Sequence, residues 1–238
     1  AVELLAKAKA SAGSSLTAFE LISSAPIERV VKYLPDIEVP QLSESKWKVL
    51  IELSLERKGE ESVLMPILES AFESELISDA AIANSIGDSK VFWHVRESIP
   101  LADRTAGGSI HSDISLPISK IPGFIEITSQ RLLEAYPWLG LSIYGHLGDG
   151  NLHFNFVSPE DPKATYHHEE GIRDILYTAV NEFEGSISAE HGIGMLKLEH
   201  NYQFKAPLEI ELMDRIKEAL DPHGILNPGK LLKPKRNY

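Results

Sequence analysis

The sequence predicts an α+β fold, in which helices flank a largely antiparallel sheet and a helical segment follows at the C-terminus. Three observations support this class. Apolar residues recur at helical spacing in several segments, shorter strand-like runs lie between them, and two of these runs flank an Asp-Gly pair typical of an antiparallel hairpin. Helices segregated from such a sheet form an α+β layer structure.

The expected elements follow the chain in order. Residues 1–12 form an Ala- and Lys-rich helix, 16–22 form a strand, and 23–40, which contains three prolines, is a connection with a short helix at 27–33. The further expected strands are 47–55, 109–116, 139–144 and 152–157. The further expected helices are 62–77, 88–103, 117–135, 164–183 and 207–220.

The composition excludes several function classes. A chain of 238 residues with 43% hydrophobic residues is ordinary globular material, and its net charge of −12 argues against a nucleic-acid groove. There are no cysteines, so any metal must be held by His, Asp or Glu. No run is apolar enough to cross a bilayer, and no internal linker separates independent domains. Because the chain starts at Ala1 without a Met or a signal peptide, we expect it to continue a longer polypeptide.

The hairpin around Asp149-Gly150 carries the strongest chemical signal. As a two-residue type I′ turn, this pair would place His146 opposite His153 and Tyr144 opposite Asn155. The Cβ atoms of the two histidines would then lie roughly 4.5–5.5 Å apart, close enough to bind one metal ion. The other face of the hairpin is apolar and suits a core: Ile143, Leu147, Leu152, Phe154 and Phe156.

A third metal ligand is available in the segment Ser188-Ala189-Glu190-His191-Gly192-Ile193-Gly194. Glu190 precedes glycines that let the backbone approach a ligand closely, and two His with one Glu leave open positions for substrate or water. His191 would then be free to act as a base. The alternative is that His146 and His153 are an exposed cross-strand pair and that Glu190-His191 caps a helix.

Three further segments carry weaker signals. Arg96, beside Trp93, could bind a substrate carboxylate through two parallel hydrogen bonds, although an arginine in this setting is usually solvated or paired with an acid. His111 and Asp113 alternate on one strand face, a pattern that most often marks exposed polar positions. The turn-rich segment 224–230 could simply end the last helix.

Taken together, four motifs resemble the C-terminal half of FAD-linked 2-hydroxy-acid dehydrogenases of the vanillyl-alcohol-oxidase superfamily, the group that includes D-2-hydroxyglutarate and D-lactate dehydrogenases. The motifs are Gly145 to His153, Ser188 to Gly194 with Lys197, Asp113 to Pro117, and Asp221 to Lys230. The resemblance implies a ferredoxin-like substrate or cap domain at about 16–185 and a segment at about 186–238 that returns to the flavin. The FAD-binding domain would precede Ala1, so the isolated chain should be inactive.

The resemblance also implies roles for individual residues. His146, His153 and Glu190 match the ligands of a divalent metal, commonly zinc, and His191 matches the base that removes the hydroxyl proton. The substrate would be bound by Arg96, His111 and Asn155, and Asn227 and Lys230 would contact the flavin. Where the hydroxyglutarate enzymes carry a threonine and a lysine, this chain has Pro100 and His111, which weakens the expected recognition of a second, distal carboxylate.

The expected function is therefore the substrate- and metal-binding part of an FAD-dependent enzyme that oxidises a D-2-hydroxy acid to a 2-oxo acid. Such an enzyme passes electrons to a separate acceptor, and the resemblance allows a homodimer in the bacterial cytoplasm or a mitochondrial-matrix setting. Two alternatives remain open. The His/His/Glu set could activate water in a stand-alone hydrolase, although the sequence lacks a His-Glu-x-x-His helix, or the chain could be a non-catalytic α+β binding module.

Overall fold

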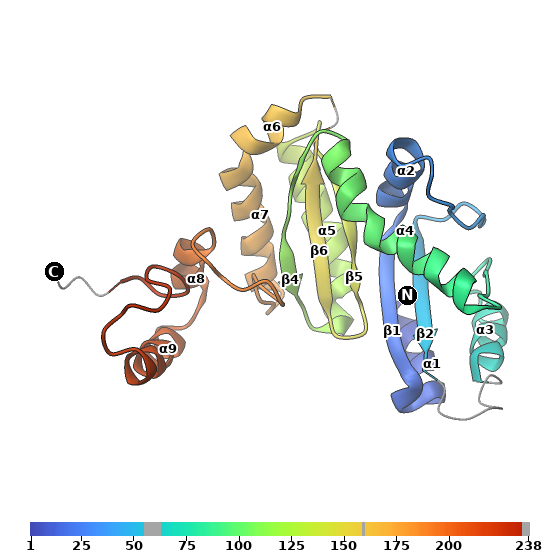
Figure 1. Ribbon diagram of the computed structural model, residues 1–238, viewed down its shortest axis with the longest axis horizontal. Helices are drawn as coiled ribbons and strands as arrows, with labels where there is room; N and C mark the ends of the chain where they lie inside the picture. The colour runs from blue at the N-terminus through green and yellow to red at the C-terminus, as the bar shows by residue number, and fades with distance from the viewer. Residues whose placement is uncertain (55–62, 159, 235–238) are drawn as a thin grey trace.

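The computed structural model describes residues 1–54, 63–158 and 160–234. Its centre is an antiparallel sheet of six strands in the order β2-β1-β5-β6-β3, with β4 also paired to β6 (Figure 1). Helices flank this sheet, which confirms the α+β class predicted from the sequence.

The strands lie close to their expected positions. They are β1 (Leu16–Ser23), β2 (Trp47–Leu53), β3 (Ser109–Ile110), β4 (Asp113–Ser115), β5 (Gly140–His146) and β6 (Asn151–Val157). The one strand expected at 109–116 is two short strands. Between them, the N–H of Ser112 donates to the side-chain Oδ1 of Asn155 at 2.9 Å, so a side chain replaces a backbone partner of the ladder.

The helices also follow the expected periodicity. They are α1 (Val2–Ala12), α2 (Ser24–Tyr33), α3 (Leu64–Glu73), α4 (Ile86–Thr105), α5 (Ile121–Ala135), α6 (Pro162–His167), α7 (Glu169–Glu182), α8 (Leu198–Phe204) and α9 (Pro207–Leu220). The helix expected at 117–135 starts with a 3-10 turn, the one expected at 164–183 is broken at His168, and α8 was not expected. Leu55 and Ser62, at the ends of two expected elements, lie outside the described residues.

The two faces of the sheet bury different clusters. The larger core includes Phe154, Phe156 and the other apolar residues of the hairpin, and the ring of Phe154 packs edge-on against Phe124 of α5 at 5.8 Å. On the opposite face a smaller cluster joins Ile22 and Tyr144 of the sheet to residues of α2 and α4. The polar side of the hairpin therefore faces α4, which covers part of it.

The hairpin register differs from the two-residue turn expected at Asp149-Gly150. Tyr144 pairs with His153 and β6 begins at Asn151, so four residues, 147–150, connect the strands. Leu147 is fully buried, and the N–H of Gly148 donates to the Phe19 carbonyl of β1 at 3.2 Å. The docking of this loop on β1 thus overrides the local turn preference. Because the register shifts by two residues, every side chain keeps its face.

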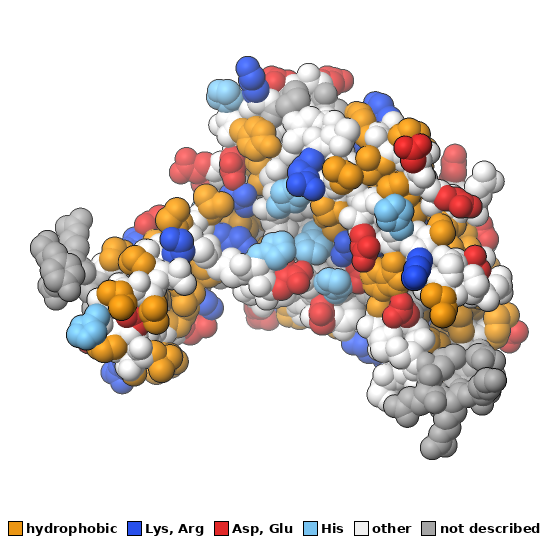
Figure 2. All heavy atoms as spheres, in the orientation of Figure 1, with side chains coloured by type: hydrophobic (Ala, Val, Ile, Leu, Met, Phe, Trp, Pro, Cys, Tyr) orange, Lys and Arg blue, Asp and Glu red, His pale blue; other side chains and the backbone are white. Residues whose placement is uncertain are grey.

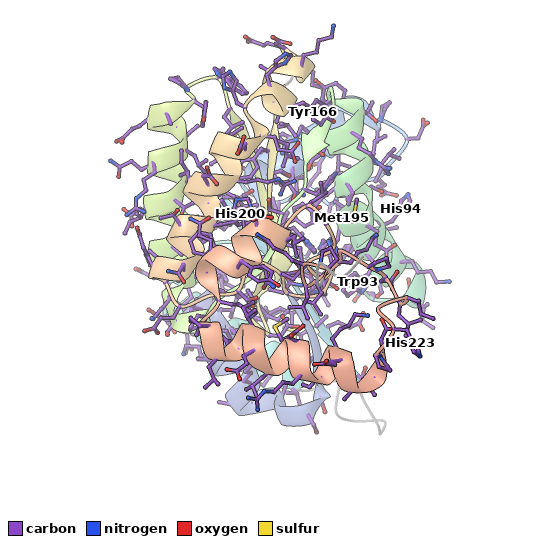
Figure 3. All side chains as sticks on the ribbon, turned by 90° about the vertical axis from the view of Figure 1, so that its left-hand side faces the viewer. Trp93, His94, Tyr166, Met195, His200 and His223 are labelled. Atoms are coloured by element: carbon purple, nitrogen blue, oxygen red, sulfur yellow. The ribbon has the colours of Figure 1, made fainter. Side chains whose placement is uncertain are left out.

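The C-terminal segment extends away from the sheet (Figure 1). Helix α8 packs on α7, since His200 Nε2 lies 2.9 Å from Asp174 Oδ1 and its ring packs edge-on against Tyr177 at 4.9 Å. Figure 3 labels His200 at this junction. Helix α9 buries none of its residues. Its exposed apolar side chains lie one helical turn apart and form a stripe: Leu208, Leu212, Ile216 and Leu220.

Candidate functional site

A cavity of about 400 Å³ opens between α4, the hairpin and the loop after α7. Figure 2 shows histidine side chains gathered near the centre of this face of the molecule. The lining residues come from four parts of the chain: Trp93, Arg96, Glu97 and Pro100 of α4; His111 and Ser112; Tyr144, His146, His153 and Asn155 of the hairpin; and Glu190 and His191.

The structure brings together the three predicted metal ligands. The Nε2 atoms of His146 and His153 lie 4.0 Å and 3.6 Å from the same Glu190 oxygen, Oε1. The two imidazole centroids are 6.0 Å apart, so the diagonal pairing of the actual register still places both rings at one position. Asn151, which starts β6, donates to Glu190 Oε1 from Nδ2 at 2.9 Å and orients the carboxylate.

A second combination of donors overlaps the first. Four residues each offer one donor atom, and these atoms all lie within 4.8 Å of one another: Asp113, His153, Glu190 and His191. The His191 ring stacks on that of His153 at 5.8 Å, and its side chain is exposed. His191 is therefore placed either to ligate a metal or to act as a base beside it.

Asp113 is a buried anchor for the loop that carries Glu190. Its Oδ2 accepts the backbone N–H groups of Ala189, Glu190 and His191 at 3.1, 2.9 and 2.8 Å. Burial alone would raise the pKa of Asp113, but these hydrogen bonds lower it, so the carboxylate stays charged. The interpretation of Asp113 as an exposed polar position was wrong, because its side chain is 1% exposed.

Glu20 of β1 is the site residue that sequence reasoning missed. Its Oε2 accepts from Arg96 Nε at 2.7 Å, and its Oε1 lies 2.5 Å from His146 Nδ1. Burial would raise the pKa of Glu20, but the His146 hydrogen bond and the Arg96 charge lower it, while the same hydrogen bond raises the pKa of His146. With Nδ1 held by Glu20, His146 presents Nε2 to the cavity, as metal-binding histidines commonly do. The available signal was an acid inside the apolar run of β1.

Arg96 is paired with an acid, one of the two outcomes considered from the sequence. Its guanidinium also lies over the Tyr144 ring, 4.6 Å from the centroid. The one hydrogen bond of its side chain among the described residues uses Nε, so the terminal nitrogens remain for a ligand in the cavity. Carboxylate binding by Arg96 stays a prediction.

Burial favours the neutral forms of His153 and Tyr144, and a hydrogen bond from Asn155 fixes Tyr144. Burial, with the nearby charge of Arg96, lowers the pKa of His153 to about 4, so its ring is neutral at pH 7 and can donate a lone pair to a metal. Burial also raises the pKa of Tyr144 to about 12. Asn155 is 1% exposed, and its Nδ2 donates to the Tyr144 hydroxyl at 3.1 Å, so it positions Tyr144 at the cavity wall.

The remaining predicted residues are divided between the cavity and the exterior. His111 lines the cavity with Nε2 2.9 Å from Ser109 Oγ, and burial lowers the pKa of its ring. Asn227 and Lys230 lie in the loop after α9, where the Lys230 N–H donates to the Asn227 carbonyl at 3.3 Å. They are not brought to the cavity, and their contact with a flavin stays a prediction.

Two solved enzyme structures share the fold of this chain. The chain superposes on 4-ethylphenol oxidase from Gulosibacter chungangensis with a TM-score of 0.64, 15% identity and coverage of 99% of this chain and 52% of the other. For p-cresol methylhydroxylase the TM-score is 0.62, with 13% identity and coverage of 100% and 52%. The chain therefore shares its fold with about half of each of these two enzymes.

The chain belongs to the FAD-linked oxidases, C-terminal domain, whose family model matches residues 1–231. This is a family of oxidoreductases, and membership confirms the resemblance seen in the motifs and disfavours the hydrolase and binding-module alternatives.

Curated relatives span mitochondria and bacteria. The mitochondrial D-2-hydroxyglutarate dehydrogenase of Arabidopsis thaliana is 35% identical over 97% of this chain and 40% of its own length. The D-2-hydroxyglutarate dehydrogenase of Xanthomonas citri is 34% identical over 92% of this chain and 46% of its length. The chain thus spans less than half the length of these relatives. Among the described helices, none combines the length and apolar composition that crossing a membrane requires.

Proposed function

We propose that this chain forms the substrate- and metal-binding half of an FAD-dependent dehydrogenase that oxidises a D-2-hydroxy acid to the 2-oxo acid. The observation that carries the proposal is the convergence in one cavity of His146, His153 and Glu190 with Arg96 and His191. A metal-ligand set, a carboxylate-binding cation and a base are the groups that this oxidation needs.

The donor set fits a divalent metal such as zinc. His153 is neutral at pH 7, Glu190 supplies an oxygen within 4.0 Å of both imidazole Nε2 atoms, and Glu20 holds the other nitrogen of His146. The exposed side of Glu190 and His191 leaves room for a substrate to complete the coordination.

The chain's own residues would divide the work. Arg96, fixed by Glu20 and Tyr144, would bind the substrate carboxylate, and Asn155 would support the wall beside it. His191 would take the hydroxyl proton on its imidazole. A metal held by His146, His153 and Glu190 would supply Lewis-acid chemistry that lowers the pKa of the 2-hydroxyl group, and bound FAD would supply the acceptor for the hydride from C2.

The domain organisation is part of the same proposal. Residues of about 16–185 would form the substrate domain, and about 186–238, including Asn227 and Lys230, would return to a flavin held by the rest of a longer polypeptide. The apolar stripe on α9 supports this, because such a surface is stabilised when another part of the protein covers it. The chain alone would bind metal without turning over substrate.

The cellular setting follows the relatives. We propose a bacterial cytoplasmic or mitochondrial-matrix enzyme that passes electrons to a separate acceptor and assembles as a homodimer. One relative, from Saccharomyces cerevisiae, is named a D-2-hydroxyglutarate–pyruvate transhydrogenase, and it is 33% identical over 97% of this chain.

Metal analysis of the full-length flavoenzyme tests the proposal and separates the two donor sets. Wild type and His191→Ala should retain about one divalent ion per chain, whereas His146→Ala and Glu190→Ala should lose it. His167→Ala, on the exposed end of α6, is the matched control and should retain it. Loss of metal in His191→Ala with retention in His146→Ala would assign the ion to the other set, and no metal in wild type would refute the coordination.

Bleaching of the flavin absorbance by 2-hydroxy acids tests the reaction itself. His191→Ala should slow anaerobic flavin reduction by about 100-fold or more while metal stays bound, since a positioned base contributes roughly 10²–10⁴-fold. An unchanged rate in this variant would remove His191 from the chemistry. That result would favour the alternative in which the chain is a non-catalytic α+β binding module.

A further inference from the structure

The charges around the cavity limit which 2-hydroxy acid can bind. Arg96 is the one Lys or Arg side chain among the residues that line the cavity in the described chain. If Arg96 takes the carboxylate next to the hydroxyl, as the proposed function has it, the other described residues of the wall include no second permanent cation.

Two arginines near the cavity, Arg173 and Arg104, are either hydrogen-bonded to other protein groups or do not line the cavity. Arg173 sits behind Ser112, and its guanidinium is taken up by Glu169 and by three oxygens, the His111 carbonyl and the Ser112 and Tyr177 hydroxyls. Arg104 is exposed near the end of α4 and does not line the cavity. A buried carboxylate without a cation is costly, because it loses its hydration without gaining a partner.

The wall that would face the substrate side chain is apolar or acidic. Trp93 and Pro100 lie about two turns apart on α4, and Pro100 has neither a side-chain donor nor a backbone N–H. Glu97, on the same helix, brings a carboxylate to the rim. His111, across the cavity, has its Nε2 atom 2.9 Å from Ser109 Oγ, and an imidazole is not a permanent cation near neutral pH.

We propose that the acid oxidised at this site is a 2-hydroxy monocarboxylic acid with an uncharged side chain. The dicarboxylic 2-hydroxyglutarate, after which several relatives are named, would place its distal carboxylate against Trp93, Pro100 and the like charge of Glu97. The inference rests on the proposed function and narrows its substrate class.

The test compares D-2-hydroxybutyrate with D-2-hydroxyglutarate in the full-length flavoenzyme. The value of kcat/KM, measured by dye-linked flavin reoxidation, should be at least about 100-fold higher for hydroxybutyrate, since like-charge contact and an unpaired carboxylate disfavour the diacid. Product binding gives a second readout. Titration of flavin fluorescence with 2-oxobutyrate and 2-oxoglutarate should show the same preference in Kd.

Introducing a cation tests the cause of the preference. His111→Lys should shift the kcat/KM ratio toward hydroxyglutarate by about 10-fold or more, whereas His167→Lys, the same change outside the cavity, should leave the ratio unchanged. Using the ratio within one preparation cancels any loss of folded enzyme.

The outcomes separate this inference from the proposed function. Reduction of the flavin by neither acid would refute both. Equal or better oxidation of hydroxyglutarate would overturn the inference and leave the proposed function standing. In that case, a selective loss of hydroxyglutarate activity in Arg104→Ala would locate the missing cation at the rim of the cavity.

Discussion

Replacement of Glu20 should disturb both functions of the cavity at once. The carboxylate is 1% exposed and joins Arg96, which would bind substrate, to His146, which would bind metal. Glu20→Gln keeps the shape of the side chain but removes the charge and one of the two acceptor oxygens. Either Arg96 Nε or His146 Nδ1 then meets an amide NH₂ group instead of an acceptor.

The magnitude follows from burial. Hydrogen bonds to charged groups contribute roughly 1.5–3 kcal/mol each, and removing one partner of a buried ion pair costs roughly 3–5 kcal/mol. We expect about 2–4 kcal/mol of destabilisation for Glu20→Gln and about 3–5 kcal/mol for Glu20→Ala. For a domain of this size, 3 kcal/mol corresponds to a fall in Tm of roughly 6–12 °C.

Calorimetry and metal titration of the full-length protein measure the two effects. Apart from the loss of stability, metal affinity should fall roughly 10–100-fold, because the partner that orients a ligating histidine is lost. Glu28→Gln, which removes the same charge from an exposed position on α2, should change stability by less than about 0.5 kcal/mol. A Glu20→Gln protein with the Tm and metal content of wild type would refute the assigned role.

Two further predictions concern backbone and pH. Gly145→Ala should destabilise the protein by roughly 1–3 kcal/mol, because φ is +150° and a Cβ would lie 2.6 Å from the Asn151 carbonyl oxygen. In the control Gly148→Ala, the added Cβ meets an ordinary contact at 3.7 Å. Equal urea midpoints for the two variants would contradict the prediction. The pKa of Asp221 is lowered by hydrogen bonds from Lys217 and from the backbone after α9. The stabilisation that the Asp221 carboxylate contributes is present above its ordinary pKa of 3.8 and is lost as the pH falls through the lower pKa of the folded protein. Pepsin should therefore cleave this segment more readily near pH 2 than near pH 4. Asp221→Asn should weaken that dependence, and an identical pH profile would count against it.

Periodicity and turn residues were enough to locate most elements, because apolar spacing reflects which face is buried. The hairpin register was not predictable in this way. It depends on the hydrogen bond from the Gly148 N–H to the Phe19 carbonyl of β1, a contact between segments far apart in the chain. Helix α8 was missed because it has seven residues and one buried side chain, Asn201, too few for a periodic signal.

The candidate site was likewise predicted only in part from the sequence. Residue types and motif spacing brought His146, His153, Glu190 and Arg96 to attention. Glu20 was missed because its partners lie 76 and 126 residues further along the chain, and a lone acid in a strand has no local pattern that identifies it. Asp113 was misread for a related reason, since its partners are backbone N–H groups of a distant loop.

One helix supplies a whole wall of the cavity. Trp93, Arg96, Glu97 and Pro100 all come from α4, whereas the proposed metal donors come from β5, β6 and the loop after α7. Under the proposed function, mutations at Trp93, Glu97 and Pro100 would therefore change which substrate side chain is accepted, while Arg96 and the proposed metal donors would keep the reacting end in place. A family built in this way can diversify its substrates by altering a single helix. Paralogues that differ on α4 should therefore differ in substrate specificity more than in the reaction that they catalyse.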